Sequence, residues 1–245
     1  MPEGADRRPA YYAARGGGWR DWWTLLHPPY TAWHLSYVVL GACLAPRVET
    51  SRLVATVLAF FLAVGLAAHA VDELHGRPLA TAIPDAALVA VTVVGLAGAV
   101  VLGIVGIDRV GLVLVPFIVV GPLLVLAYNA ELFGGIVHTT AGFAAAWGAF
   151  PVLTGYVAQS STLSAAAVLG AVAALALSWA QRALSTPARR IRRATRSVDG
   201  AMTLDDGTTV TLDEAALLGP LEAALRGLSW AMVALASALA LARLT

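Results

Sequence analysis

Long apolar runs, separated by short polar breaks, fill most of this chain. A helix that spans a membrane needs about 20 consecutive, mostly apolar residues. By this rule we expect about seven spans, at residues 30–45, 53–74, 86–107, 110–130, 136–158, 163–184 and 228–244. Residues that interrupt helices separate these runs, among them Pro46, Pro84, the Gly134-Gly135 pair and Pro187. The pattern predicts an all-α, polytopic transmembrane helix bundle.

The polar segments divide the chain into four parts. Residues 1–26 form a polar N-terminal tail, residues 27–184 a six-span membrane core, residues 185–227 an Arg-rich segment, and residues 228–245 the final span. Within 185–227, the alternation from Met202 to Leu212 around Asp206-Gly207 predicts a β-hairpin. Apolar residues at helical spacing from Asp213 to Arg226 then predict an amphipathic helix on the inner membrane face.

The composition requires a lipid-facing surface and excludes several classes of function. Charged residues make up 13% of the chain and hydrophobic residues 59%, whereas soluble domains carry about 25% charged residues. The net charge of +1 argues against nucleic acid as a partner. Every basic residue is Arg, which excludes Schiff-base chemistry on lysine. Cys43 is the single cysteine, so the chain forms no internal disulfide.

Arginine placement gives an orientation, because basic residues concentrate in cytoplasmic segments. Arginines gather in the N-terminal tail and again after residue 184. Six expected spans, an even number, separate these two segments, so both can lie on the same side. We therefore expect an integral protein of a prokaryotic-type inner or cell membrane, with a cytoplasmic N-terminus and a cytoplasmic 185–227 segment.

Polar residues within or beside apolar spans are costly, so they are the first candidates for function. They form four sets: His27, Tyr30, His34 and Tyr37; His69, Asp72, Glu73 and Arg77; Tyr128, Asn129, Glu131 and His138; and the arginines that follow Gln181. Members of the first two sets recur at helical spacing and so share a helix face. In the expected orientation all four sets lie at the cytoplasmic membrane face.

Two chemistries fit these residue types. In one, Asp72 and Glu73 hold Mg²⁺ and Arg77 pairs with the diphosphate of an amphiphile, since Mg²⁺ prefers carboxylate and phosphate oxygens. In the other, histidines and carboxylates bind Fe or Zn directly. The candidate metal ligands are His34, His69, Asp72, Glu73, Glu131 and His138.

Several segments resemble the UbiA-type intramembrane prenyltransferase superfamily. The run from His27-Pro-Pro-Tyr-Thr31 into Leu40-Gly-Ala-Cys-Leu-Ala45 resembles the first helix of that family. Asp72-Glu-Leu-His-Gly-Arg77-Pro78-Leu79 resembles the end of its first aspartate-rich motif. Tyr128-Asn129 and the Pro151 to Gly155-Tyr156 segment resemble features of its middle helices. The likeness covers residues 26–184.

The resemblance implies a UbiA-like bundle that binds an isoprenyl diphosphate through Mg²⁺ on the cytoplasmic side. The candidate catalytic residues, taken from the polar sets together with this resemblance, are His69, Asp72, Glu73 and His138. The candidate substrate-binding residues are Arg77, Tyr128, Asn129, Tyr30, His34 and Tyr156. The family's second aspartate-rich motif is missing, because residues 179–185 hold no acid. A divergent member that has exchanged acids for histidines fits these residues.

Three functions remain open. The first is a metal-dependent, prenyltransferase-like enzyme that acts on an isoprenoid diphosphate or related lipid at the cytoplasmic face. The second is a His/carboxylate Fe or Zn enzyme that acts on a lipid, such as an oxidase or hydrolase. The third is a non-catalytic protein that binds or transports a lipid. For all three functions, the expected partners are membrane lipid and an isoprenoid or other amphiphilic small molecule.

Overall fold

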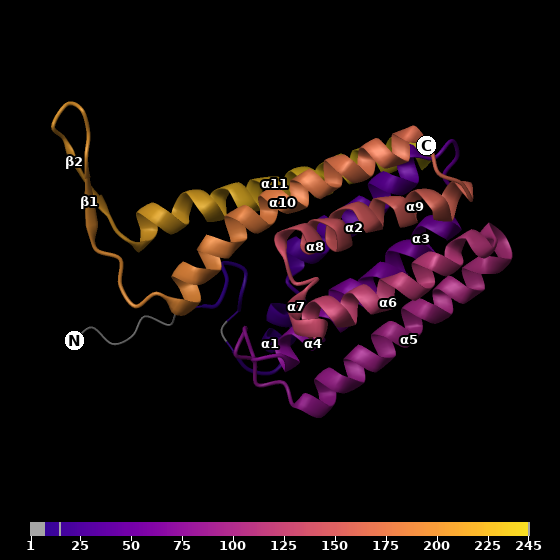
Figure 1. The fold of residues 1–245 in the computed structure, drawn as a ribbon, viewed down its shortest axis with the longest axis horizontal. Coiled ribbons are helices and arrows are strands. Elements are labelled where there is room, and N and C mark those ends of the chain that lie inside the picture. The colour runs from indigo at the N-terminus through magenta and orange to yellow at the C-terminus, as the bar shows by residue number, and fades with distance from the viewer. Residues whose placement is uncertain (1–7, 15, 245) are drawn as a thin grey trace.

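The computed structural model describes residues 8–14 and 16–244, and most of them are helical (Figure 1). The elements are listed here in chain order: α1 (Trp19–Leu25), α2 (Pro28–Leu44), α3 (Thr50–Phe60), η1 (Phe61–Ala68), α4 (His69–Leu74), α5 (Asp85–Val110), η2 (Leu112–Leu114), α6 (Val115–Asn129), α7 (Leu132–Gly135), α8 (Thr140–Ala144), η3 (Ala145–Ala149), α9 (Phe150–Ser160), α10 (Ala165–Ala194), β1 (Gly200–Thr203), β2 (Thr209–Leu212) and α11 (Glu214–Leu244). The expected all-α bundle is confirmed.

Within the described residues, six helical stretches are long and apolar enough to cross a membrane: Thr50–Leu74, Asp85–Val110, Leu112–Asn129, Thr140–Ser160, Ala165–Ala194 and Glu214–Leu244. The expected count of about seven included α2, which at 17 residues is shorter than these six. Helix α2 is nevertheless central to the fold, because Trp33 and Tyr37 on it are fully buried. The first expected span, α2, is therefore one residue shorter than the shortest of these six and lies in the core of the bundle.

Helix α2 packs closely against α9, with α11 on another side. A Cβ atom added at Gly41 of α2 would lie 2.1 Å from the Val152 carbonyl oxygen, and one at Gly155 of α9 would lie 2.2 Å from that of Val38. Both glycines thus bring the two backbones together, as small residues do between membrane helices. Next to this contact, Trp33 Nε1 donates to the Tyr37 hydroxyl at 2.6 Å.

The two last helices are longer than the sequence pattern indicated. Helix α10 continues through Pro187 to Ala194, so most arginines of the Arg-rich segment lie on a helix. Helix α11 is continuous from Glu214 to Leu244, and this differs from the expected separation into an amphipathic helix and a final span. Both helices extend beyond the rest of the bundle in Figure 1, where the hairpin connects them. Strands β1 and β2 pair antiparallel, with Met202 opposite Val210.

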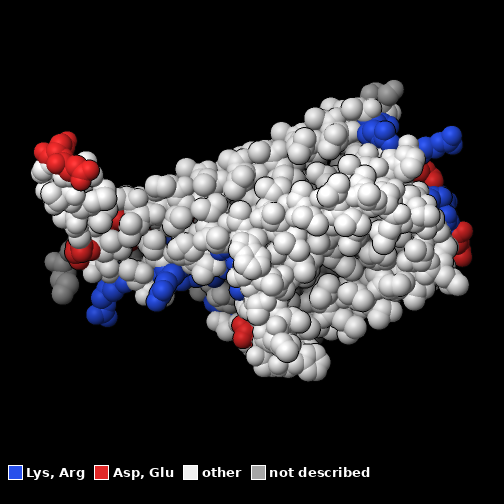
Figure 2. Space-filling view, turned by 45° about the horizontal axis from the view of Figure 1, so that its top comes forward, with Lys and Arg blue, Asp and Glu red and all other residues white. Residues whose placement is uncertain are grey.

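Charged side chains lie toward the two ends of the long axis, and the surface between them is nearly uncharged in Figure 2. The end where α10 and α11 project, here called the arginine-rich end, carries Arg182, Arg189 and Arg193 of α10. The opposite end carries Arg47, Arg52, Arg109 and Arg243, close to the start of α3 and the ends of α5 and α11. An uncharged band between charged ends suits a protein surrounded by lipid.

Candidate functional site

The arginine-rich end brings two histidines from different elements into contact. His27 precedes α2, and His69 opens α4 directly after the π-helical turn of η1. Their imidazole rings stack with centroids 4.3 Å apart and planes 18° from parallel. His69 Nδ1 is 3.1 Å from the Gly65 carbonyl oxygen and therefore donates to it, which leaves its Nε2 as the basic nitrogen.

The N-terminal segment contacts this histidine pair through Tyr12. The Tyr12 hydroxyl lies 2.6 Å from His27 Nδ1. Burial lowers the pKa of His27 well below its usual value, and the neighbouring His69 and Arg193 lower that pKa further. Burial also raises the pKa of the Tyr12 phenol. Both groups are therefore neutral near pH 7, so the phenol donates to Nδ1 and the imidazole proton lies on His27 Nε2. That nitrogen is buried and has no hydrogen-bond partner among the described residues.

A small pocket of about 50 Å³ lies beside His27, among the N-terminal segment, α10 and α11. The ion pair of Arg192 with Glu222 also lines it. Arg189 and Arg193, one helical turn apart, line it together with Tyr30. Arg193 Nε donates to the Pro9 carbonyl at 3.1 Å. Arg189 makes no hydrogen bond or ion pair with another described residue. Within the described part of the chain, the Arg189 guanidinium is therefore not held by another side chain and faces the pocket.

Asp72 lies near these cations. It interacts electrostatically most strongly with Arg189 and Arg193 and more weakly with His138. Asp72 shares the α4 face with His69, as their spacing of three residues requires. It is thus a carboxyl group within the electrostatic reach of two guanidinium groups.

A second cluster lies next to the first at the ends of α6 and α8. The His138 ring stacks on Tyr128 with centroids 4.5 Å apart, and His138 Nδ1 is 3.0 Å from the Tyr128 carbonyl oxygen. Arg182 of α10 donates to the Tyr128 hydroxyl and lies over the Phe143 ring. Glu131 is 3.6 Å from His138 Nδ1 and is largely exposed. The structure thus brings His138, Tyr128 and Glu131 together.

Glu73 and Arg77 have structural contacts that occupy their polar atoms. Glu73 is fully buried, and its carboxylate accepts three hydrogen bonds of 2.9 Å, from the Leu79 N–H, the Thr81 N–H and the Thr81 hydroxyl. Arg77 donates to the Ile83 carbonyl at 2.7 Å and pairs with Asp85. Together they hold the loop between α4 and α5 in place.

The remaining candidate residues are dispersed. His34 is buried in the bundle, with Nδ1 2.9 Å from the Trp147 carbonyl oxygen. Asn129 donates to the Val125 carbonyl of its own helix at 2.8 Å. Tyr156 packs on Ala45 and Ala167 near the opposite end of the bundle. The structure therefore does not bring Tyr156 to the other candidates.

The donor set does not fit a metal ion held by the protein alone. Among the described residues, no three His, Cys, Asp or Glu side chains gather closely enough to hold one ion. Both oxygens of Glu73 are engaged by the loop. In the stacked pair of His27 and His69, nearly parallel rings direct their nitrogen lone pairs along parallel planes, so these do not converge on a shared ion. A site for Mg²⁺, Fe or Zn stays a prediction.

Tyr12 is the residue of this site that the sequence does not indicate. It lies in the polar tail, and nothing in a linear pattern shows that the tail folds back over α2. Arg182, Arg189 and Arg193 belong to the predicted set of arginines after Gln181, but that prediction does not separate them from Arg190 and Arg192. The spacing of 189 and 193 does place both on one helix face, and this signal was available.

Comparison with protein-family models, curated proteins and solved structures finds no match for this chain.

Proposed function

We propose that this protein binds an isoprenoid or related amphiphile through its phosphate or diphosphate head, at the pocket of Arg189, Arg193 and His27. The observation that carries the proposal is the exposed Arg189 guanidinium, which lines that pocket without an ion-pair partner among the described residues. An uncommitted cation next to buried donors is a recurrent arrangement for phosphate groups, because guanidinium and phosphate form paired, charge-assisted hydrogen bonds.

The donors around the pocket suit the oxygen atoms of a phosphate or diphosphate group. Arg189 and Arg193 supply charge, and His27 Nε2–H supplies a neutral donor without a described partner. The uncharged band next to this end would accept the hydrocarbon part of the ligand, since apolar chains partition into the lipid region. A head held at the membrane surface with a tail in the hydrocarbon layer is the arrangement that an amphiphile prefers.

The reaction proposed is prenyl transfer, as the UbiA-like segments suggest. The allylic C–O bond breaks, and the diphosphate leaves with the bonding electron pair. A nucleophilic carbon or hydroxyl oxygen of a lipid-soluble acceptor forms the new bond to the allylic carbon and gives up its proton. Arg189 and Arg193 would stabilise the charge that develops on the leaving diphosphate. His69 Nε2 or Asp72, which lie nearby, would take the proton released by the acceptor.

We also propose that the arginine-rich end faces the cytoplasm. Basic residues in short segments near the ends of spans determine orientation. Arg189, Arg190, Arg192 and Arg193 all lie there on α10, in addition to the arginines of the tail. The pocket would then open to the compartment in which soluble diphosphates are made.

A second candidate is a non-catalytic carrier or receptor for the same ligand. The observation in its favour is that Glu73 and Arg77, the expected metal and head-group residues, are engaged in holding a loop. Incubation with radiolabelled geranylgeranyl diphosphate and lipid extract distinguishes the two. Release of diphosphate supports the transferase, and retention of intact ligand supports the carrier.

The binding proposal is tested by titrating geranylgeranyl diphosphate into the protein in lipid nanodiscs. Arg189→Gln should weaken binding about tenfold or more, the effect of removing one charge-assisted contact. Arg190→Gln is the matched control, because Arg190 is the next residue of α10, carries the same charge and does not line the pocket. Equal affinities of the two variants would contradict the proposal.

A further inference from the structure

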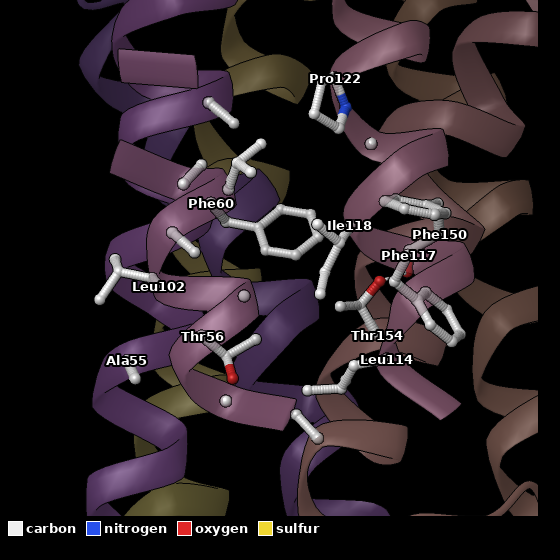
Figure 3. Close-up of a pocket in the computed structure, with 18 of the residues that line it drawn as sticks. Ala55, Thr56, Phe60, Leu102, Leu114, Phe117, Ile118, Pro122, Phe150 and Thr154 are labelled. Carbon is white, nitrogen blue, oxygen red and sulfur yellow. Dashed lines mark hydrogen bonds between the residues drawn. The ribbon is translucent and has the colours of Figure 1, made fainter. Parts of the chain in front are cut away.

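A second, larger cavity of about 320 Å³ lies within the membrane part of the bundle. Helix α3 and the π-helical turn η1 line one side, α5 and α6 another, and η3 with α9 a third. Figure 3 shows the rings of Phe60 and Phe150 at this space, with Pro122 toward one end and Thr56 and Leu114 toward the other. The volume is within the range of sites that hold small molecules.

Small side chains and two π-helical turns line this cavity. Small residues face it from two helices, with Ala55, Ala59 and Ala63 on α3 and η1 and Ala99 on α5. Two of the surrounding stretches, η1 and η3, are π-helical, and each contributes lining residues at the inner end. Such turns are rare and are frequently found at functional sites, because they displace side chains from the regular helix positions.

The cavity is charged at one end only. Its charged lining residues are Arg52 and Arg109, and no acidic residue of the described chain lines it. Both arginines lie at the end opposite to the Arg189 pocket, where α3 begins and α5 ends. The inner end, lined by Val64, Val125 and Trp147, is apolar. The cavity therefore has the polarity of an amphiphile whose head lies at the far membrane face.

The two arginines differ in how firmly they are held. Arg52 joins three elements, since it pairs with Glu49 at 2.7 Å and donates to the carbonyls of Arg109 and Gln159 at 3.0 and 3.3 Å. The Arg109 side chain is 64% exposed, and its contacts with described side chains are long, 3.5 Å to the Ser51 hydroxyl and 3.7 Å to Glu49. Arg109 is thus the cation that can turn to a ligand.

The length of the cavity fits one leaflet. From Arg52 to Val64 the wall rises by twelve residues, or about 18 Å at 1.5 Å per residue. Half of a hydrocarbon core of about 30 Å is about 15 Å. We propose that the cavity holds an acyl chain of an anionic phospholipid from the leaflet opposite to the Arg189 pocket, with its phosphate at Arg109. This site is independent of the proposed function, because its head group binds at the other membrane face.

The test is native mass spectrometry of the protein in mild detergent, titrated with phosphatidylglycerol and, separately, with phosphatidylcholine. Ala59→Phe should fill the cavity and reduce the retention of both lipids several-fold. Leu58→Phe, a neighbouring substitution of an exposed residue, should leave retention unchanged. Ala99→Leu repeats the test from the facing helix, in case Ala59→Phe does not fold. Unchanged retention in the folded cavity variants would overturn the proposal.

The charge at the mouth is tested separately. Arg109→Gln should lower the preference for phosphatidylglycerol over phosphatidylcholine about fivefold, the effect of one cation near an anionic head group. Arg47→Gln, which removes an exposed arginine of the same end outside the cavity, should retain that preference. An unchanged preference in Arg109→Gln would overturn the placement of the head. Neither variant should alter binding of geranylgeranyl diphosphate at the Arg189 pocket.

Discussion

At the scale of single residues, the structure separates polar groups that hold the fold from polar groups that remain available to a ligand. Glu73 and Arg77 form hydrogen bonds with backbone groups of the α4–α5 loop, and Asn129 donates to a carbonyl of its own helix. Arg189 and the Nε2 atom of His27 have no hydrogen-bond partner among the described residues. Residue type alone does not make this distinction, because a buried carboxylate can serve equally as a metal ligand or as an acceptor for backbone N–H groups.

The structural role of Glu73 gives the first prediction. Glu73→Ala leaves two N–H groups and one hydroxyl without their buried acceptor, so unfolding in detergent should become easier by about 3 kcal/mol. Glu131→Ala removes a largely exposed carboxylate and should change stability by less than about 0.5 kcal/mol. Chemical unfolding followed by circular dichroism measures both. A Glu73→Ala variant of normal stability would contradict the structural role.

His27 gives a prediction about pH. Burial lowers the pKa of His27 in the folded state, so the His27 imidazole binds a proton more readily in the unfolded chain than in the folded one. The stabilising contribution of neutral His27 is therefore complete above about pH 6.5, the pKa of a free imidazole, and is lost as the pH falls below that value. Unfolding midpoints at pH 7.5, 6.0 and 5.0 should decrease, and His27→Gln should make this decrease shallower.

His75 provides the control for this experiment, since it is an exposed histidine in the neighbouring loop. His75→Gln should retain the pH dependence of the wild type. If His27→Gln also retained it in full, the neutral, buried state of His27 would be refuted.

At the scale of elements, backbone contact between α2 and α9 fixes the centre of the bundle. Gly155→Ala would place a Cβ atom 2.2 Å from the Val38 carbonyl oxygen, so the two helices would have to separate. We expect a loss of about 1–3 kcal/mol or more in the free energy of unfolding. Gly219→Ala in α11 meets no atom within 4 Å and should be neutral or slightly stabilising, because alanine favours a helix. A loss of stability in Gly155→Ala no larger than in Gly219→Ala would contradict this packing.

Elements are also where sequence and structure can be compared most clearly. The apolar runs predicted the helices well, since each run of about 20 residues can only satisfy its backbone as a helix in lipid. The ends of α10 and α11 were predicted less well. Pro187 suggested a break, and a separate final span was expected from residue 228, but α10 and α11 are both continuous helices. The mutual packing of these two helices compensates for the lost hydrogen bonds, and no local pattern shows that packing.

Part of the candidate site was predictable from the helical spacing of its polar residues. His69, Asp72, Tyr128 and His138 do gather at one end of the bundle, as helix spacing and the number of spans required. The contact of Tyr12 with His27 joins a polar tail to a helix start, and the engagement of Glu73 depends on a loop conformation. Both are tertiary features without a periodic signal.

At the scale of the whole molecule, the uncharged band places the hairpin and the Arg189 pocket on one side of the membrane and Asp108 on the other. In a Cys43→Ala background, Asp205→Cys in the hairpin should react with a membrane-impermeant maleimide only after cells are permeabilised. Asp108→Cys should react in intact cells. Both positions are exposed, so the two sites differ mainly in sidedness. The reverse pattern of labelling would place the arginine-rich end outside.

The central claim is that a phosphate head is recognised by the arginine-rich pocket, and it is tested most directly by comparing two ligands with the same tail. The affinity for geranylgeranyl diphosphate and for geranylgeraniol is measured in nanodiscs, with wild type beside an Arg189→Gln, Arg193→Gln variant. We predict that the wild type prefers the diphosphate at least about tenfold and that the variant loses this preference. Equal affinities of the wild type for both ligands would contradict the account.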